Sequence, residues 1–301
     1  MRWRPEREIR IVAGTPAGGG QDRPARALIR ALESQALVDA PIALVNIPGR
    51  GGSNAWDHVA RHRGDAHLLA ITAPPLVTNK LLGQSIVDAS DLTPLAVLCT
   101  EYIAFVARAD SRLRRADDLL RRLKNPADLA IALATATGNT NHIALARCTR
   151  HAGGDVRALR IRVFDSALDA AAEVIAGEAE LAVVTAVSAA KPLAAGMLRG
   201  LAVSAPQRLP REWADVPTWR ELGVDCVVGT WRGVAAPPGL TIDQIAYWSD
   251  ALTTASRTPE WNAELERNFW ANTCLDSAAT RAFLESERDA TRRALADMGL
   301  L

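Results

Sequence analysis

The stretch Ile9-Arg-Ile-Val-Ala-Gly-Thr-Pro-Ala-Gly-Gly-Gly-Gln-Asp22-Arg-Pro24 decides the fold of this 301-residue chain. It predicts a short β-branched strand that enters a glycine-rich turn, and then a helix with Asp22 as N-cap and Pro24 just inside it. Glycine leaves backbone N–H groups uncovered, and the helix dipole adds positive charge at the same place. An anion is therefore the expected ligand of this turn.

The same pattern recurs after one more strand. Residues 41–46 predict a second strand, residues 48–52 form a second glycine turn, Ser53 is the expected cap of a second helix, and residues 67–72 predict a third strand. With right-handed crossovers, this order places all three loops at the carboxyl ends of parallel strands, where open α/β sheets bind ligands. We expect the two glycine turns to converge on one cleft.

Neither turn carries a nucleotide-binding motif. There is no G-K-[ST], and residues 14–19 do not spell G-x-G-x-x-G, so neither a P-loop nor a dinucleotide fingerprint is predicted. An alternative interpretation is that the glycines only make tight strand-to-helix turns, because glycine is the usual residue there.

Composition is that of a globular α/β protein. With 49% hydrophobic residues and a net charge of +1, the chain can bury a substantial core in one or two domains. No basic excess indicates nucleic-acid binding. No run reaches the roughly 18 apolar residues that a membrane-spanning helix needs.

Cysteine and histidine positions do not predict a metal site. The four cysteines have no C-x-x-C spacing, and the five histidines form no H-E-x-x-H or other metal motif, so neither zinc nor another cofactor is expected. An oxidising compartment would permit one disulfide, but the sequence does not choose the pair among Cys99, Cys148, Cys226 and Cys274.

The remaining chain predicts further strands and helices. A tail from Thr241 onward is expected to be mostly helical, with Ser277 capping the last long helix. Helices are predicted at residues 112–124 and 143–151, and strands at residues 95–99, 102–107, 129–133, 160–164, 181–185 and 200–204.

An ordered series of segments resembles one known family. The segments are Trp3 to Val12, Pro16-Ala-Gly-Gly-Gly-Gln-Asp22, Val45-Asn-Ile-Pro-Gly-Arg-Gly-Gly52, Asn79, Gly177-Glu-Ala-Glu180, Val216-Pro-Thr218 and Trp231-Arg-Gly-Val-Ala-Ala-Pro237. Over essentially its whole length the chain resembles the tripartite tricarboxylate transporter receptors, the Bug or TctC-like periplasmic solute-binding proteins. The resemblance implies a type II periplasmic-binding-protein fold, an α/β fold of two doubly wound lobes joined by a two-crossing hinge. Lobe 1 would comprise residues 1–100 plus 236–301, and lobe 2 residues 101–235.

The resemblance also implies a function. The chain would be an extracytoplasmic receptor that captures a small organic anion, a carboxylate, between two lobes that close like a Venus flytrap. Its partners would be the membrane subunits of a tripartite tricarboxylate-type transporter, or a sensor protein if it is an orphan receptor. We expect a monomer that binds no nucleic acid, and the sequence does not say which acid is bound.

An α/β enzyme that acts on a small anionic substrate is the rival interpretation. Ser/His/Asp hydrolysis would need a nucleophile elbow such as G-x-S-x-G, which is absent, and no H-E-x-x-H is present. We therefore assign no catalytic residue, although fold alone does not separate the two classes.

The predicted ligand-binding residues come from both lobes. At three of them the chain departs from the family pattern: Thr15 replaces an aromatic residue, Arg50 a small one and Thr185 an acid. Arg50 could clamp a carboxylate or point to solvent. Asp22 could cap its helix or contact the ligand, and His142 could be a ligand contact or a capping or core residue. The full set is Thr15, Ala17, Gly18, Gly19, Asp22, Arg50, Gly51, Gly52, Ser53, Thr72, Ala73, Thr135, Thr137, Asn139, Thr140, His142, Asp165, Ser166 and Thr185.

The start of the chain does not match an exported precursor. Met1 is followed almost at once by the first strand, without the charged and apolar regions of a signal peptide. The simplest expectation is a mature periplasmic form whose export signal has been removed. A cytoplasmic homologue is the alternative.

Overall fold

The computed structural model describes residues 3–301, so the expectation about Met1 lies outside the described residues. The chain divides into two compact units, unit 1 (Met1–Thr100 and Trp231–Arg292) and unit 2 (Glu101–Thr230 and Arg293–Leu301). It passes from one unit to the other within strand β4 (Thr93–Arg108), strand β9 (Gly229–Ala236) and helix α10 (Ser277–Asp297).

Helix α10 supplies a third connection that the sequence analysis did not include. The predicted division left all of residues 236–301 in lobe 1, whereas the last nine residues belong to unit 2. Side chains of unit 2 hold them there: Arg150 Nη1 donates to Asp297 Oδ2 at 2.7 Å, and the Arg157 guanidinium packs against Gly299. The point at which the chain re-enters unit 1 also differs from the prediction, because residues 231–235 belong to unit 1 and not to unit 2.

Unit 1 is built on parallel strands. Strand β1 (Ile9–Ala13) lies between β2 (Ile42–Asn46) and β3 (Leu68–Thr72), with Ile11 opposite both Leu44 and Leu69. Strand β3 pairs antiparallel with β9, β9 neighbours β4, and β10 (Trp270–Leu275) also pairs with β4.

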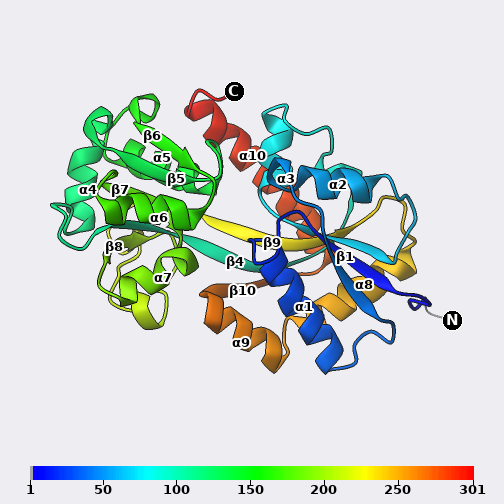
Figure 1. Cartoon of the computed structure of the whole chain (residues 1–301). Helices are drawn as coiled ribbons and strands as arrows, with labels where there is room; N and C mark the ends of the chain where they lie inside the picture. The colour runs from blue at the N-terminus through cyan, green and yellow to red at the C-terminus, as the bar shows by residue number, and fades with distance from the viewer. Residues whose placement is uncertain (1–2) are drawn as a thin grey trace. The chain divides into compact units, whose positions relative to one another are not determined.

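Helices of unit 1 cover both faces of this sheet (Figure 1). Alternate residues of β1 point to opposite faces, so Ile11 packs in one core with Trp248 and Trp261, while Val12 packs in another with Trp56. The first core holds α1 (Asp22–Ser34), α8 (Ile242–Ala255) and α9 (Pro259–Asn268), and the second holds α2 (Ser53–Ala60) and α3 (Pro75–Leu81). Burial on both faces explains the unbroken apolar sequence of β3.

Unit 2 repeats the parallel arrangement with different strands. Strand β5 (Ile131–Ala134) lies between β6 (Ile161–Phe164) and β7 (Leu181–Thr185), and β4 pairs antiparallel with both β7 and β8 (Leu198–Val203). The helices of this unit are α4 (Ala116–Leu123), α5 (Thr140–His151), α6 (Ala167–Ala176) and α7 (Ala186–Ala194). Short 3-10 helices lie at Arg50–Gly52, Ala89–Asp91, Pro126–Asp128, Val156–Ala158 and Arg211–Trp213.

Most predicted elements are confirmed, the mostly helical tail included; the structure adds two details and corrects one. Residues 95–99 and 102–107 are parts of one continuous strand, β4. The tail also contains strand β10, which was not predicted. Ser277 does not cap α10: its hydroxyl donates to the Pro94 carbonyl at 2.7 Å, and Asp276 Oδ1 accepts the Ala279 N–H instead. No helix within residues 3–301 has both the length and the apolar character of a membrane span.

Candidate functional site

The two glycine turns of unit 1 touch each other. A Cβ atom on Gly14 would lie 2.5 Å from Gly52 Cα, and a Cβ atom on Gly52 would lie 2.5 Å from Gln21 Nε2. The Gln21 side chain joins the turns by accepting the Gly14 N–H at 2.9 Å through Oε1. The two turns therefore meet, as the sequence predicts, and the contact is possible because Gly14 and Gly52 carry no side chains; the cleft itself stays a prediction.

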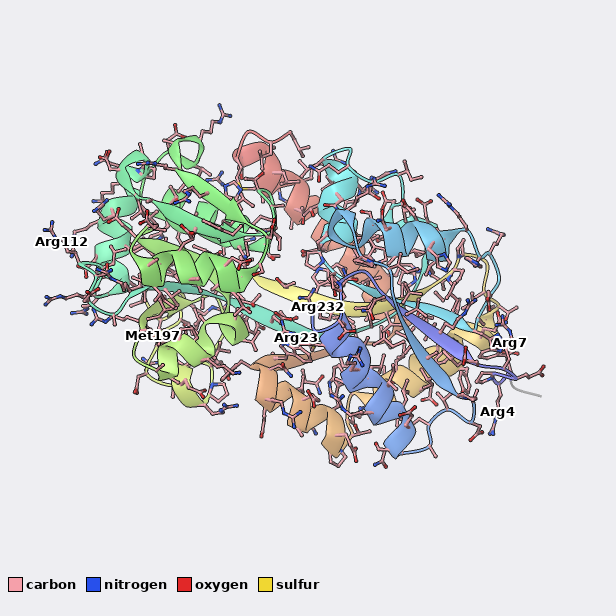
Figure 2. All side chains as sticks on the ribbon, viewed as in Figure 1. Arg4, Arg7, Arg23, Arg112, Met197 and Arg232 are labelled. Atoms are coloured by element: carbon pink, nitrogen blue, oxygen red, sulfur yellow. The ribbon has the colours of Figure 1, made fainter. Side chains whose placement is uncertain are left out.

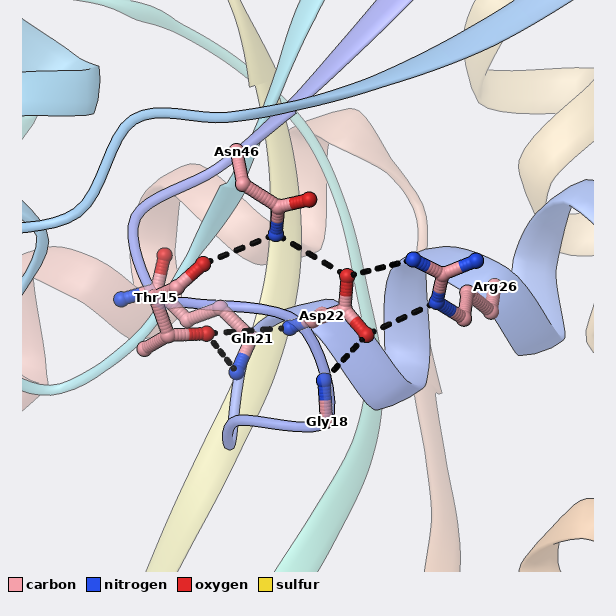
Figure 3. Close-up of polar contacts among 6 residues, drawn as sticks. All are labelled: Thr15, Gly18, Gln21, Asp22, Arg26 and Asn46. Atoms are coloured by element: carbon pink, nitrogen blue, oxygen red, sulfur yellow. Dashed lines mark hydrogen bonds and ion pairs between the residues drawn. The ribbon is translucent and has the colours of Figure 1, made fainter.

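The carboxylate of Asp22 holds the first turn in shape (Figure 3). Its side chain is fully buried, and Oδ2 accepts both the Gly18 N–H and Arg26 Nε at 2.8 Å. Oδ1 accepts Asn46 Nδ2 at 2.9 Å and Arg26 Nη2 at 3.2 Å. Although burial alone would raise it, the pKa of Asp22 is lowered by these hydrogen bonds from Arg26, Asn46 and Gly18. Asp22 is thus an ionised structural group of the turn.

Thr15, and not Asp22, covers the start of helix α1. Asp22 is the first helical residue, so its prediction as N-cap is wrong, and Gln21 occupies the cap position without a capping side-chain bond. Thr15 Oγ1 accepts the N–H groups of Gln21 and Asp22, each at 3.2 Å. Asn46 Nδ2, at the end of β2, donates to the Thr15 carbonyl at 2.8 Å and so fixes the same residue from its other side.

Fewer N–H groups are available to a ligand than the sequence predicts. Besides those covered by Thr15, the Gly18 N–H goes to Asp22 and the Gly19 N–H to the Pro16 carbonyl. Among residues 3–301, the N–H groups of Thr15, Ala17 and Gly20 donate no hydrogen bond. These three donors lie in a turn whose other polar groups are fixed.

The second turn is fastened from helix α3. Asn79 Nδ2 donates to the Arg50 carbonyl at 2.9 Å and to Ser53 Oγ at 3.1 Å. Ser53 is the first helical residue of α2 and Gly52 is its cap, so the prediction of Ser53 as N-cap is wrong. The serine hydroxyl is buried against Asn79 instead.

The Arg50 guanidinium is engaged within unit 1. Its Nη1 lies 3.4 Å from Asp57 Oδ2, its Nη2 donates to the Gln84 carbonyl, and half of the side chain is exposed. To clamp a ligand, as one of the two interpretations of the sequence requires, Arg50 would have to leave these partners.

The third loop of unit 1 is buried. Thr72 Oγ1 would lie 2.7 Å from a Cβ atom on Gly233, and the Ala73 carbonyl accepts the Leu76 N–H at the start of α3. Both residues therefore support the strand-to-helix junction.

Four polar side chains of unit 1 were missed as site residues. Gln21, Asn46 and Asn79 carry amides that fix the turns, and Arg232 of β9 places its Nη2 3.0 Å from a Cβ position on Gly20. Figure 2 shows Arg232 beside the start of α1, and its side chain is buried. Gln21 and Arg232 each adjoin a glycine in the sequence, but the partners of Asn46 and Asn79 lie far away in the chain, so the sequence carried no local signal for these two amides.

Unit 2 brings its predicted residues to one edge of its sheet. Ala134 pairs with Phe164 and Leu133 with Val183, so the loops that begin at Thr135, Asp165 and Thr185 follow neighbouring parallel strands. The Thr135 N–H donates to the Phe164 carbonyl at 2.7 Å, which ties the first two loops together.

Asn139 and His142 hold the loop that begins at Thr135. Asn139 caps α5, because its Oδ1 accepts the His142 N–H at 3.0 Å, and its Nδ2 donates to Thr135 Oγ1 at 2.9 Å. The Gly138 N–H donates to His142 Nδ1 at 3.0 Å. Burial lowers the pKa of His142 to about 4, so the imidazole is neutral at physiological pH and accepts this bond.

The other predicted residues of unit 2 differ in exposure. Thr137 and Asp165 are exposed, whereas Thr140 is buried with its hydroxyl 2.7 Å from Thr230 Oγ1. Ser166 caps α6 by accepting the Asp169 N–H, and Thr185 Oγ1 lies 2.9 Å from Ser188 Oγ. Within residues 3–301, no group of three or more His, Cys, Asp or Glu side chains could hold a metal ion.

Comparisons with known proteins agree with this fold. A family model described as "Tripartite tricarboxylate transporter family receptor" matches residues 26–300. A Pseudomonas protein encoded in a tcbD-tcbE intergenic region is 29% identical over 261 residues, 85% of this chain and 76% of that protein. A TctC solute binding protein from Polaromonas has a similar crystal structure, with a TM-score of 0.78, 25% identity and coverage of 97% of this chain and 99% of that chain. The R. palustris protein Rpa4515 with adipate has the same fold, with a TM-score of 0.84, 19% identity and 98% of each chain covered.

Proposed function

Because this chain belongs to the tripartite tricarboxylate transporter receptor family, we propose that it is an extracytoplasmic receptor for a small carboxylate. The observation that carries the proposal is the set of three unpaired N–H groups, at Thr15, Ala17 and Gly20, in a turn fixed by buried hydrogen bonds. A carboxylate can accept several such bonds at once.

The turn is suited to an anion in two further respects. Its own carboxylate, Asp22, is already paired with Arg26, so little negative charge repels the ligand. The buried Arg232 guanidinium lies against Gly20 and adds positive charge beside the donors. Since the donors are fixed before the ligand arrives, little conformational entropy is lost on binding.

The predicted residues of unit 2 supply mostly neutral groups. Thr137 is exposed beside a loop that Asn139 and the neutral His142 hold in place. Hydroxyl and backbone groups of this kind recognise an acid by shape and hydrogen bonding and add no formal charge. The membrane subunits of a transporter, or a sensor protein, are the proposed recipients of the ligand-bound receptor.

A thermal-shift screen tests the proposal. Di- and tricarboxylates, aromatic acids and acidic amino acids are compared with neutral amides of the same skeletons and with nucleotides. At least one carboxylate should raise Tm progressively with concentration, because a ligand that binds only the folded state stabilises it by mass action. A response to nucleotides and to no carboxylate would contradict the proposal.

A pair of variants at Thr15 tests the named site. Thr15→Val removes the hydroxyl that accepts the N–H groups of Gln21 and Asp22 and so loosens the turn that carries the three free donors. Ordering the turn again on binding should cost roughly 1–1.5 kcal/mol, which weakens binding of the best acid by about tenfold. Thr15→Ser keeps the hydroxyl and should retain most of the affinity. Equal affinity in all three proteins, measured by titration calorimetry, would place the ligand elsewhere.

A further inference from the structure

Two of the four cysteines lie against each other inside unit 2. Cys148 belongs to helix α5, Cys226 to the segment that leads into β9, and both side chains are fully buried. Cys226 Sγ donates to the Ala144 carbonyl at 3.5 Å, and Ala144 precedes Cys148 by about one helical turn on the same face of α5. The two thiols are neighbours, and Cys226 adds to the effect of burial in raising the pKa of Cys148.

We propose that Cys148 and Cys226 form a disulfide when the chain folds in an oxidising compartment. The inference relies on the proposed extracytoplasmic function only for that compartment, because such compartments permit disulfides to persist. The sequence alone left the pairing open, and this geometry chooses one of the possible pairs.

The chemistry needs a disulfide oxidant of low molecular weight or a thiol oxidoreductase. One cysteine thiolate attacks the oxidant's S–S bond and displaces one thiol, and the second cysteine thiolate then attacks the mixed disulfide and displaces the other. Two protein thiols lose two electrons, the oxidant gains them, and the two protons appear on the displaced thiols.

Oxidation belongs to folding and not to the finished structure. Both thiols are inaccessible to solvent, and burial raises the pKa of Cys148, which keeps it protonated and unreactive once folded. Disulfide exchange must therefore occur before unit 2 has closed around the pair.

With the disulfide in place, both ends of α5 would be bonded to the segment that leads into β9. At its start, Thr140 is already hydrogen-bonded to Thr230 through their hydroxyls, at 2.7 Å. At its other end, the disulfide would join Cys148 to Cys226, four residues before Thr230. Helix α5 follows the predicted ligand loop of unit 2, so the disulfide would stiffen the support of that loop.

Refolding of the full chain tests the inference. The denatured, reduced protein is refolded with mixed oxidised and reduced glutathione, denatured again, and alkylated with a maleimide. The wild type should carry two maleimides, and peptide mapping should recover Cys148 linked to Cys226. Its Tm should fall by on the order of 5–10 °C in reductant, because the cross-link restricts the unfolded chain.

Single variants provide the controls. Cys148→Ser and Cys226→Ser should each abolish the linked peptide and make Tm insensitive to reductant, while Cys274→Ser should change neither result. Four alkylated cysteines, or a bridge that uses Cys99 or Cys274, would overturn the inference. Carboxylate binding is measured separately on the same samples, so its absence would count against the proposed function and leave the thiol result standing.

Discussion

The turn of unit 1 at Thr15–Asp22 and the loop of unit 2 at Thr135–His142 both join a strand to a helix, but side chains of different charge hold them. Each follows the carboxyl end of a parallel strand and leads into a helix. The first is held by the ionised carboxylate of Asp22, and the second by an amide and a neutral imidazole. Because Asp22 and His142 titrate in different pH ranges, the two regions should respond differently to acid.

The two regions also differ in how they accommodate an unusual backbone. In unit 1 the positive φ of 78° falls on Gly18, which tolerates it, whereas in unit 2 a φ of 68° falls on the β-branched Thr135. Thr135 is kept there by the bond that its hydroxyl accepts from Asn139. The loop of unit 2 also uses a glycine, Gly138 with a φ of 81°, so it carries one strained residue more than the turn of unit 1.

The largest expected effect lies where the glycine turns of unit 1 touch. Gly14→Ala puts a methyl group 2.5 Å from Gly52 Cα, where only backbone movement can relieve the clash, and should destabilise the protein by roughly 3 kcal/mol or more. Gly18→Ala is the matched control: nothing lies within 4 Å, so only its positive φ opposes the change, at about 1 kcal/mol. Denaturant unfolding compares the two, and equal losses would refute the close contact.

Acid should weaken unit 2 before unit 1. His142 has a pKa of about 4 in the folded protein and about 6.5 when unfolded, so the unfolded chain binds the proton first. Its contribution is complete above pH 6.5 and falls by about 3 kcal/mol as the pH drops to 4. His142→Asn should flatten this part of the stability profile. If wild type and variant lose stability in parallel between pH 6.5 and 4, His142 is not the group responsible.

Asp22→Asn tests the charged hydrogen bonds that hold the first turn of unit 1. The amide keeps the shape but gives up the charge-assisted bonds from Arg26 and the Gly18 N–H, so unfolding should become easier by about 2 kcal/mol. Because the pKa of Asp22 is lowered in the folded protein, the wild type should unfold less readily than the variant at neutral pH. This difference in unfolding free energy should shrink as the pH falls below the usual carboxyl range. Chemical denaturation at pH 7 measures the difference, with the more exposed Arg26→Gln expected to cost less.

The smallest expected effect is at Arg50. Its side chain is half exposed and pairs with Asp57, so Arg50→Ala should change stability by less than about 1 kcal/mol and carboxylate affinity by less than threefold. A tenfold loss of affinity in calorimetry would show that the guanidinium leaves Asp57 for the ligand, and would restore the clamp that the sequence allows.

The sequence predicted the fold well because the strands and glycine turns are local signals. The apolar runs of β1, β3 and β7 and the glycines before α1 and α2 need no distant partner to be recognised. The roles of side chains in the turns did depend on distant partners. Asp22 looked like a cap because the sequence cannot show Thr15 folding back onto α1, or Asn46 arriving from the next strand. Arg50 was undecided for the same reason, since Asp57 and Gln84 settle its direction.

The contact between Gly14 and Gly52 also limits how such a receptor can diversify. A side chain on Gly14 would meet Gly52 Cα, and a side chain on Gly52 would meet Gln21 and Trp56, so a substitution at either glycine requires its neighbours to move. Ala17 and Thr137 are exposed in their loops and carry no such constraint. Substitutions at these two positions should therefore cost less stability than substitutions at Gly14 or Gly52.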